Sequence, residues 1–162
     1  MDCYACQLTQ GQKDLSGGRV HRTQHWVVEH CTGPLGVGTL IVKPLRHCLH
    51  LWELTSQETA EMGPLLHEVS QVVSELLQPS QVYVCLWSHA GWQPQHLHFV
   101  VQPSWENLKN ISDKPGPYLQ ATMLQTGETP DRAAVKQFCE DARGVFQKNR
   151  PLTFSPLRST GN

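Results

Sequence analysis

A long amphipathic segment in the middle of the chain constrains the fold more than any other feature. Apolar residues recur at intervals of three and four between positions 62 and 77, which is the spacing of one helix face. Thr55-Ser56-Gln57-Glu58 has the form of a capping box and starts this helix, and Pro79 ends it. The sequence therefore predicts one long helix with a buried face.

Short segments of β type lie on both sides of this helix. Residues 20–29 are rich in β-formers, and residues 38–43 form a second strand, so we expect the two to pair as a hairpin. Two apolar runs, 82–87 and 96–101, follow the helix and have the composition of central strands. Together these elements predict an α+β domain.

The remainder of the chain is less strongly patterned. Thr129-Pro130-Asp131 can open a second helix, because apolar residues recur from there to Phe146. No repeat or internal linker divides the sequence, so residues 1–148 are predicted to form a single domain. Residues 149–162 contain two prolines and few apolar side chains, and we expect a flexible tail there.

Composition excludes several classes of protein. The chain has 162 residues, of which 39% are hydrophobic, so it can bury a core and is not disordered throughout. Thirteen basic residues are balanced by 14 acidic residues without a basic run, which argues against binding to a nucleic acid polymer. The N-terminus does not resemble a signal peptide and no segment has the length of a membrane span. We therefore expect a cytoplasmic protein with no membrane partner.

Two pairs of residues suggest chemistry. In a reducing compartment Cys3-x-x-Cys6 is half of a metal site, a redox pair, or an unliganded pair at a loose terminus. His96 and His98 stand at i and i+2 of a predicted strand and would project from the same face, which core packing does not require. The alternative for both histidines is a satisfied polar role on a half-exposed strand.

Two stretches resemble the signature segments of the histidine triad (HIT) superfamily. Residues 90–103, AGWQPQHLHFVVQP, are similar to its Ala-Gly loop and the following His-x-His-x-His strand with a later Pro. Residues 38–47, GTLIVKPLRH, are similar to its Gly-His-x-apolar-apolar-apolar-Pro-x-x-His segment. The resemblance covers residues 3 to 105 and implies a HIT-like fold, with the long helix packed on an antiparallel sheet and a C-terminal helix. It also implies a homodimer.

The resemblance makes His96 the first histidine of the triad and His98 the second, and Val100 occupies the third position. A register shifted by two residues would instead place Pro94 at the first position. The unshifted register keeps the Ala-Gly loop and Pro103 at their family distances, and we prefer it. Replacement of the third histidine is shared with the galactose-1-phosphate uridylyltransferase branch, where Gln is usual.

A structural zinc site is also implied by the resemblance. That branch and many bacterial HIT proteins use a Cys-x-x-Cys pair, a histidine after the Pro-x-x-His strand, and the first triad histidine. Two thiolates and two imidazoles form a closed tetrahedral set without an open position, as structural zinc requires. The corresponding residues are Cys3, Cys6, His47 and His96. His50 is a weaker alternative to His47.

The family's second histidine attacks the α-phosphorus of a nucleotide and becomes covalently nucleotidylated. The resemblance therefore implies that His98 is the nucleophile of a nucleotide hydrolase or transferase, and a neutral imidazole is competent for this step. Cys85 and Val100 depart from the family pattern, because an Asn that contacts the phosphate is frequent at the first position and a His fills the second. The alternative function is therefore a zinc-stapled nucleotide-binding or interaction module with weak or no turnover.

Substrate-binding residues are predicted from the same comparison. The loop before the histidines and the strand that contains them supply polar side chains that can contact the phosphate, and the preceding strand supplies an acidic residue for the ribose. These candidates are Gln93, Gln102, Ser88 and Glu29. Trp87 lies near the same loop, where it can stack on a base or pack beneath the loop.

Overall fold

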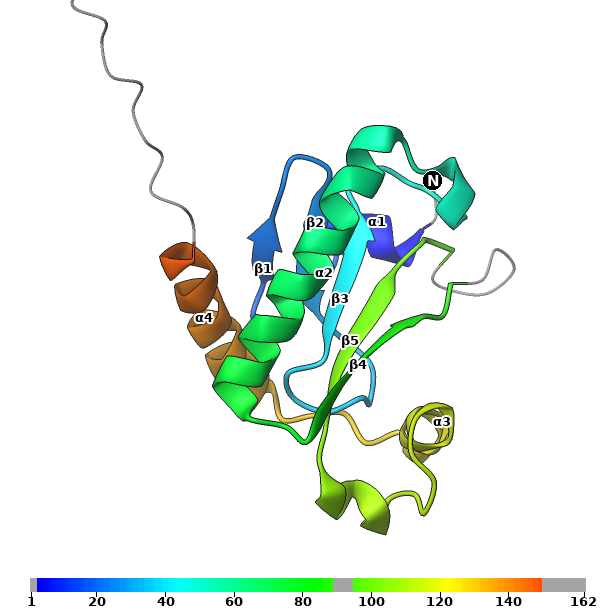
Figure 1. The fold of residues 1–162 in the computed structure, drawn as a ribbon, viewed down its shortest axis with the longest axis vertical. Helices are drawn as coiled ribbons and strands as arrows, with labels where there is room; N and C mark the ends of the chain where they lie inside the picture. Colours follow the sequence, from blue (N-terminus) through cyan, green and yellow to red (C-terminus); the bar gives the residue numbers. More distant parts are fainter. Residues whose placement is uncertain (1–2, 89–94, 150–162) are drawn as a thin grey trace, which may run out of the picture.

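The computed structural model describes residues 3–88 and 95–149, which form a five-stranded antiparallel sheet with helices on both faces (Figure 1). The spatial order of the strands is β1-β2-β3-β5-β4. The strands are β1 (Arg19–Arg22), β2 (Trp26–His30), β3 (Leu40–Pro44), β4 (Gln81–Leu86) and β5 (Phe99–Ser104). The helices are α1 (Tyr4–Thr9), α2 (Ser56–Leu77), α3 (Pro117–Thr126) and α4 (Arg132–Lys148), with 3-10 turns η1 (Leu51–Glu53) and η2 (Glu106–Asn110).

Helix α2 confirms the predicted long helix and its capping box. The Thr55 hydroxyl accepts from the Glu58 backbone N–H at 3.2 Å, and the Glu58 carboxylate accepts from the Thr55 N–H at 2.7 Å. These two bonds satisfy backbone donors that the first helical turn leaves without partners. The helix ends at Leu77, and Gln78 leaves it with a left-handed backbone, φ 46°.

The sheet confirms the predicted hairpin between β2 and β3, which pair antiparallel. Residues 20–29 are nevertheless divided into β1 and β2, because a turn intervenes in which the Thr23 hydroxyl accepts from the Trp26 N–H at 2.9 Å. The predicted strand at 96–101 begins only at Phe99. Before it, the Leu97 N–H donates to the Cys48 carbonyl at 2.7 Å, so this backbone binds the loop after β3 and lies outside the sheet ladder.

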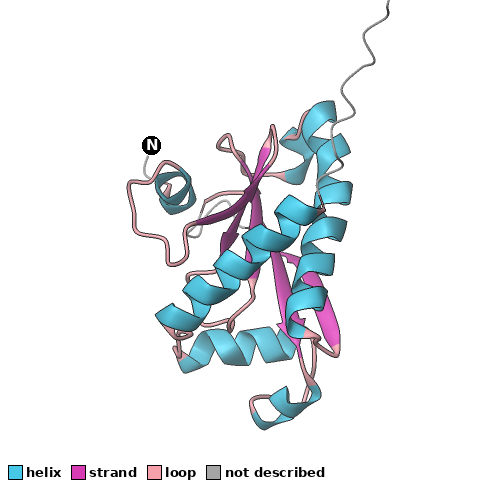
Figure 2. Ribbon diagram, turned by 90° about the vertical axis from the view of Figure 1, so that its left-hand side faces the viewer, coloured by secondary structure: helices cyan, strands magenta, loops and turns pink. Residues whose placement is uncertain are grey.

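Successive side chains of a strand point to opposite faces of the sheet, so the protein has one hydrophobic core on each face. The larger core lies between one face of the sheet and helices α2 and α4. The smaller core, formed by Leu35, Val100, Leu119 and Met123, lies on the other face beneath α3. Helix α1 is also on this second side, opposite α2 (Figure 2). The second face is therefore only partly filled by apolar packing, which leaves room for a site.

Helix α4 confirms the predicted C-terminal helix, which Asp131 caps by accepting from the Ala134 N–H at 2.8 Å. Helix α3 was not predicted. Gly116 has a positive φ of 66° before its first residue, Pro117, and Gly127 ends the helix with φ 70°. Residues 150–162 of the predicted tail lie outside the described residues. None of the helices in the described ranges is long and apolar enough to cross a membrane.

Candidate metal centre and active-site cavity

Four potential metal ligands from distant parts of the sequence meet at one end of the sheet. The ligand atoms of Cys3, Cys6, His47 and His96 all lie within 4.8 Å of one another. The Cys6 Sγ is 3.5 Å from the His47 Nδ1 and 3.4 Å from the His96 Nδ1. Zinc–sulfur and zinc–nitrogen bonds at the tetrahedral angle place such atoms about 3.6 Å apart. The donor set and its spacing thus fit a structural zinc ion.

His96 has the protonation state and orientation that a metal ligand needs. Its Nε2 lies 3.0 Å from the Pro44 carbonyl oxygen, which can only accept, so Nε2 carries the hydrogen and Nδ1 points its lone pair at the thiols. Burial lowers the pKa of His96 to about 4, because desolvation penalises the imidazolium. The ring is therefore neutral near neutral pH and available for metal binding.

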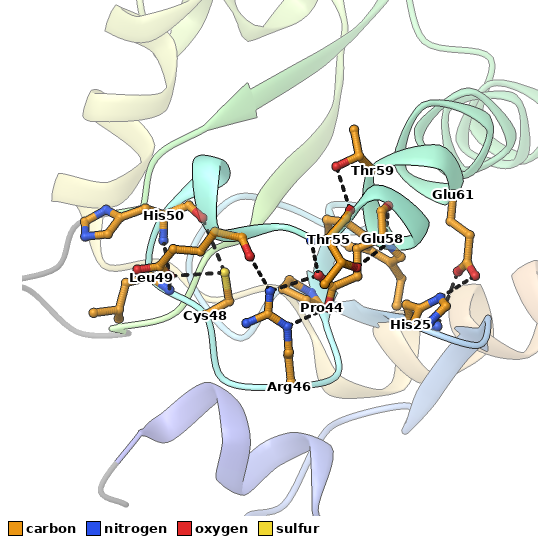
Figure 3. A network of polar contacts seen from close by, with 12 residues as sticks. His25, Pro44, Arg46, Cys48, Leu49, His50, Thr55, Glu58, Thr59 and Glu61 are labelled. Atoms are coloured by element: carbon orange, nitrogen blue, oxygen red, sulfur yellow. Dashed lines mark hydrogen bonds and ion pairs between the residues drawn. The ribbon is translucent and has the colours of Figure 1, made fainter.

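The loop that supplies His47 is fixed by a polar network (Figure 3). Arg46 donates to both carboxylate oxygens of Glu58, at 2.7 and 2.9 Å, and to the Glu53 carbonyl at 2.6 Å. The Glu53 carboxylate in turn accepts from the N–H groups of residues 49 and 50, at 3.0 and 3.2 Å. His50 stacks on Trp52 and is not in the metal cluster, whereas His47 is.

A cavity of about 470 Å³ lies between the second face of the sheet, α1 and α3. Its lining is predominantly apolar, with His98 and one acidic and one basic side chain among the described residues. The residues that line it are Tyr4, Ala5, Leu8, Glu29, His30, Cys31, Thr32, Gly33, Leu35, Ile41, Lys43, Trp87, His98, Val100, Pro117, Gln120, Ala121 and Leu124. A cavity of this size and character is typical of small-molecule sites.

His98 is oriented by backbone and by Ser88. Its Nδ1 lies 2.8 Å from the His96 carbonyl oxygen, which assigns the hydrogen to Nδ1 and leaves the lone pair on Nε2. The Ser88 hydroxyl accepts from the His98 backbone N–H at 2.8 Å and lies 3.5 Å from Nδ1. The structure thus places Ser88, a predicted substrate contact, against the body of His98.

Gln102 occupies a different position from the one expected of a substrate contact. Its side chain is fully buried and is not among the cavity-lining residues. Its amide donates to the Leu35 carbonyl at 3.1 Å and its oxygen accepts from Gln120 at 2.8 Å. Gln120 accepts from the Trp87 indole N–H at 2.7 Å. This chain of bonds ties α3 to the sheet and holds Trp87 against the cavity.

The two departures from the family pattern lie side by side. Cys85 of β4 is the register partner of Val100 of β5, and Val100 lines the cavity. Neither side chain offers a strong hydrogen bond to a phosphate oxygen. Gln93, predicted as a further phosphate contact, lies outside the described residues.

Glu29 does line the cavity, and its partner was not foreseen from the sequence. The Glu29 carboxylate lies 2.6 Å from the Lys43 ammonium, and both side chains are at most 3% exposed. Lys43 also donates to the Ala5 carbonyl of α1 at 2.8 Å. A lysine in an otherwise apolar strand between Val42 and Pro44 was the one available signal, since lysine is almost never fully buried unless paired.

Solved structures resemble this chain over most of its length. A zinc-bound histidine triad family protein from Mycobacterium smegmatis matches with a TM-score of 0.66 and 18% identity, covering 91% of this chain and 95% of that chain. A hypothetical histidine triad nucleotide-binding protein from Sulfolobus tokodaii matches with a TM-score of 0.67 and 16% identity, over 90% and 93% of the two chains. A Hit-like protein involved in cell-cycle regulation from Bartonella henselae matches with a TM-score of 0.65 and 14% identity, covering 89% of this chain and 96% of that chain.

Sequence comparison adds no closer relative. No family model and no curated protein matches the chain. The structural likeness nevertheless extends over both the sheet and its helices, and it agrees with the resemblance of residues 38–47 and 90–103. The chain therefore has the fold of the histidine triad proteins.

Proposed function

We propose that the protein is a nucleotidyl hydrolase or transferase that acts at the α-phosphate of a nucleoside phosphate derivative. The observation that carries this proposal is the setting of His98. Its Nδ1 lies 2.8 Å from the His96 carbonyl oxygen, and its ring lines a cavity of about 470 Å³. Among the described residues, His98 is not part of the cysteine–histidine cluster that can hold a metal. A neutral imidazole held in this way is a competent nucleophile.

The reaction proceeds as two displacements at phosphorus. The His98 Nε2 forms a bond to the α-phosphorus while the bond to the leaving group breaks, and the leaving group departs with the electron pair. Water or another acceptor then attacks the nucleotidyl-histidine and restores the free ring. Such transfers depend mainly on positioning and on donors that stabilise the phosphoryl oxygens.

Covalent modification of His98 tests this proposal. The zinc-loaded protein is incubated briefly with nucleoside phosphoramidates, dinucleoside polyphosphates and sugar nucleotides, and its intact mass is measured under denaturing conditions. We expect a nucleotidyl mass increment, or product formation, in the wild type and neither in His98→Ala. His67→Ala, a substitution on α2, is the matched control and is expected to behave as the wild type.

The alternative function is a nucleotide-binding or interaction module without efficient turnover. Cys85 and Val100 favour it, because the loss of each donor to a developing charge costs on the order of 3 kcal/mol of transition-state stabilisation. Native mass spectra that show bound nucleotide, without any adduct or product, would support this module and contradict the enzyme.

Zinc, dimerisation and location complete the proposal. The cysteine–histidine cluster is proposed to hold one structural zinc ion per chain. A homodimer is proposed because β4 is an edge strand with Val84 44% and Leu86 39% exposed. A cytoplasmic location is proposed because none of the six cysteines, all within the described residues, forms a disulfide.

A further inference from the structure

A buried ion pair lies in the wall of the cavity that contains His98. Glu29 and Lys43 are the two oppositely charged residues among the described residues that line this cavity, 2.6 Å apart. Ala5, Leu8 and Ile41 line the same cavity; the Ala5 carbonyl accepts from Lys43, and Ile41 is the register partner of Glu29. Removing two charges from water costs more than packing two apolar side chains of similar volume, so the fold alone does not require the pair.

The strand register places the pair at a defined distance from His98. Glu29 faces Ile41 across β2 and β3, and Ile41 faces Val100 across β3 and β5. Lys43 lies two residues after Ile41 in β3, and His98 lies two residues before Val100, just outside β5. Lys43 and His98 both line the cavity. Glu29 is therefore two strand spacings, roughly 10 Å, from the strand that follows His98. This span is comparable with a nucleoside 5′-phosphate measured from its phosphorus to the far edge of its base.

The pair presents an ordered set of hydrogen-bonding groups. One oxygen of Glu29 is engaged by Lys43, and a carboxylate has two oxygens that together accept about four bonds. Lys43 carries three N–H donors, of which Glu29 and the Ala5 carbonyl engage two. A ligand that reaches this wall therefore meets acceptors from the carboxylate beside a donor from the ammonium.

The resemblance implied a ribose contact for Glu29, and its pairing with Lys43 in the cavity wall points to another role. We propose that Glu29 and Lys43 form a base-reading element that selects guanine over adenine, an inference that rests on the proposed function and replaces the ribose contact. Guanine presents two adjacent donors, N1–H and N2–H, beside the O6 acceptor, which complements a carboxylate beside an ammonium. Adenine presents one amino donor and an N1 acceptor, so part of the carboxylate would face a lone pair. A buried polar group left without its partner is what makes such sites selective.

The other residues of the pocket suit a purine. Trp87 lines the cavity and is fixed by its bond to Gln120, so its indole can stack on a planar base. Hypoxanthine retains O6 and N1–H but lacks the N2 amine. It should therefore bind with an affinity between those of guanine and adenine.

Binding of simple nucleotides to the zinc-loaded wild type tests the inference without any substitution. Dissociation constants of guanosine, inosine and adenosine 5′-monophosphates are measured by isothermal titration calorimetry. We expect guanosine monophosphate to bind at least about tenfold more tightly than adenosine monophosphate, with inosine monophosphate between them.

A neutral replacement of the pair shows whether these two residues cause the preference. The double substitution Glu29→Leu with Lys43→Met removes both charges and keeps similar volume, which proteins tolerate better than removal of one partner. We expect this variant to fold, by circular dichroism, and to bind the three nucleotides within about threefold of one another. Glu61→Gln, which alters the His25 ion pair beside α2, is the control and should keep the guanine preference.

The outcomes separate the inference from the proposed function. Equal affinity of the wild type for the three nucleotides, or a guanine preference that survives in the double variant, overturns the base-reading role and leaves the chemistry of His98 intact. Absence of binding by all three, together with absence of a His98 adduct, overturns both.

Discussion

At the residue scale, the chemistry of this site depends on which nitrogen of each histidine carries the hydrogen. In His96 the bond to the Pro44 carbonyl turns Nδ1 toward the thiols, whereas in His98 the bond to the His96 carbonyl turns Nε2 away from the backbone. The two histidines are two residues apart in sequence, yet the lone pair is on Nδ1 in His96 and on Nε2 in His98. One suits a metal ligand and the other suits a nucleophile.

Ser88 is a positioning residue for His98, because its hydroxyl bonds the His98 N–H at 2.8 Å. We expect Ser88→Ala to lower kcat about tenfold with little change in KM, since it displaces the nucleophile and leaves the apolar cavity in place. Steady-state kinetics on the substrate found by mass spectrometry measure this effect. Ser80→Ala, at an exposed serine before β4, is the control. A rise in KM at constant kcat would instead identify Ser88 as a substrate contact.

At the element scale, the start of α2 connects secondary structure to the metal centre. Glu58 caps the helix and also holds Arg46, which fixes the loop that supplies His47. The Arg46 guanidinium and the Thr55 N–H lower the pKa of Glu58 to about 2. The capping box was readable from the sequence, whereas the ion pair to Arg46 depends on how the loop folds back.

Acid should weaken the fold through Glu58. A carboxyl with a depressed pKa in the folded state stabilises it above the unfolded pKa, near 4.5, and this contribution is lost as the pH falls toward 2. The shift corresponds to about 3 kcal/mol, and solvent around the half-exposed Arg46 reduces it to on the order of 2 kcal/mol. We expect Glu58→Gln to lower the free energy of unfolding by this amount at pH 7, and the difference from the wild type to shrink steadily below pH 4.5 and to vanish only below about pH 2. Denaturant unfolding at several pH values measures the difference, and a constant gap would contradict the assignment.

At the scale of the whole molecule, α1 joins the metal centre to the cavity. Cys3 and Cys6 belong to the metal cluster, while the Ala5 carbonyl between them accepts from Lys43 and the helix lines the cavity. The described structure shows no side-chain cap on this six-residue helix. Short helices are marginal alone, so α1 depends on the metal ligands and on Lys43 for its position.

Removal of zinc should therefore destabilise the protein as a whole. We expect a chelator to lower the Tm by at least about 5 °C, because the binding energy of a structural metal is folding energy. Differential scanning calorimetry, with metal content by mass spectrometry, measures this change. Cys6→Ser should reproduce it, whereas Cys85→Ser, outside the cluster, should retain one zinc per chain. A Cys6→Ser protein with wild-type zinc content and Tm would contradict the assignment.

The sequence by itself determined the elements with strong local signals. The capping box and apolar spacing specified α2, and the apolar runs indicated strands. The resemblance of residues 38–47 and 90–103 to the histidine triad segments implied the zinc ligands Cys3, Cys6, His47 and His96. These features are local, or they repeat a pattern in fixed order, so they can be read without knowing the packing.

Only the tertiary structure decided what lies beside His98. The Glu29–Lys43 pair joins two strands 14 positions apart in the chain, and the bonds from Gln102 through Gln120 to Trp87 join β5, α3 and the end of β4. Whether a buried lysine or glutamine has a partner depends on contacts between distant segments. Helix α3 likewise has weak local signals and acquires its position by covering the second face of the sheet.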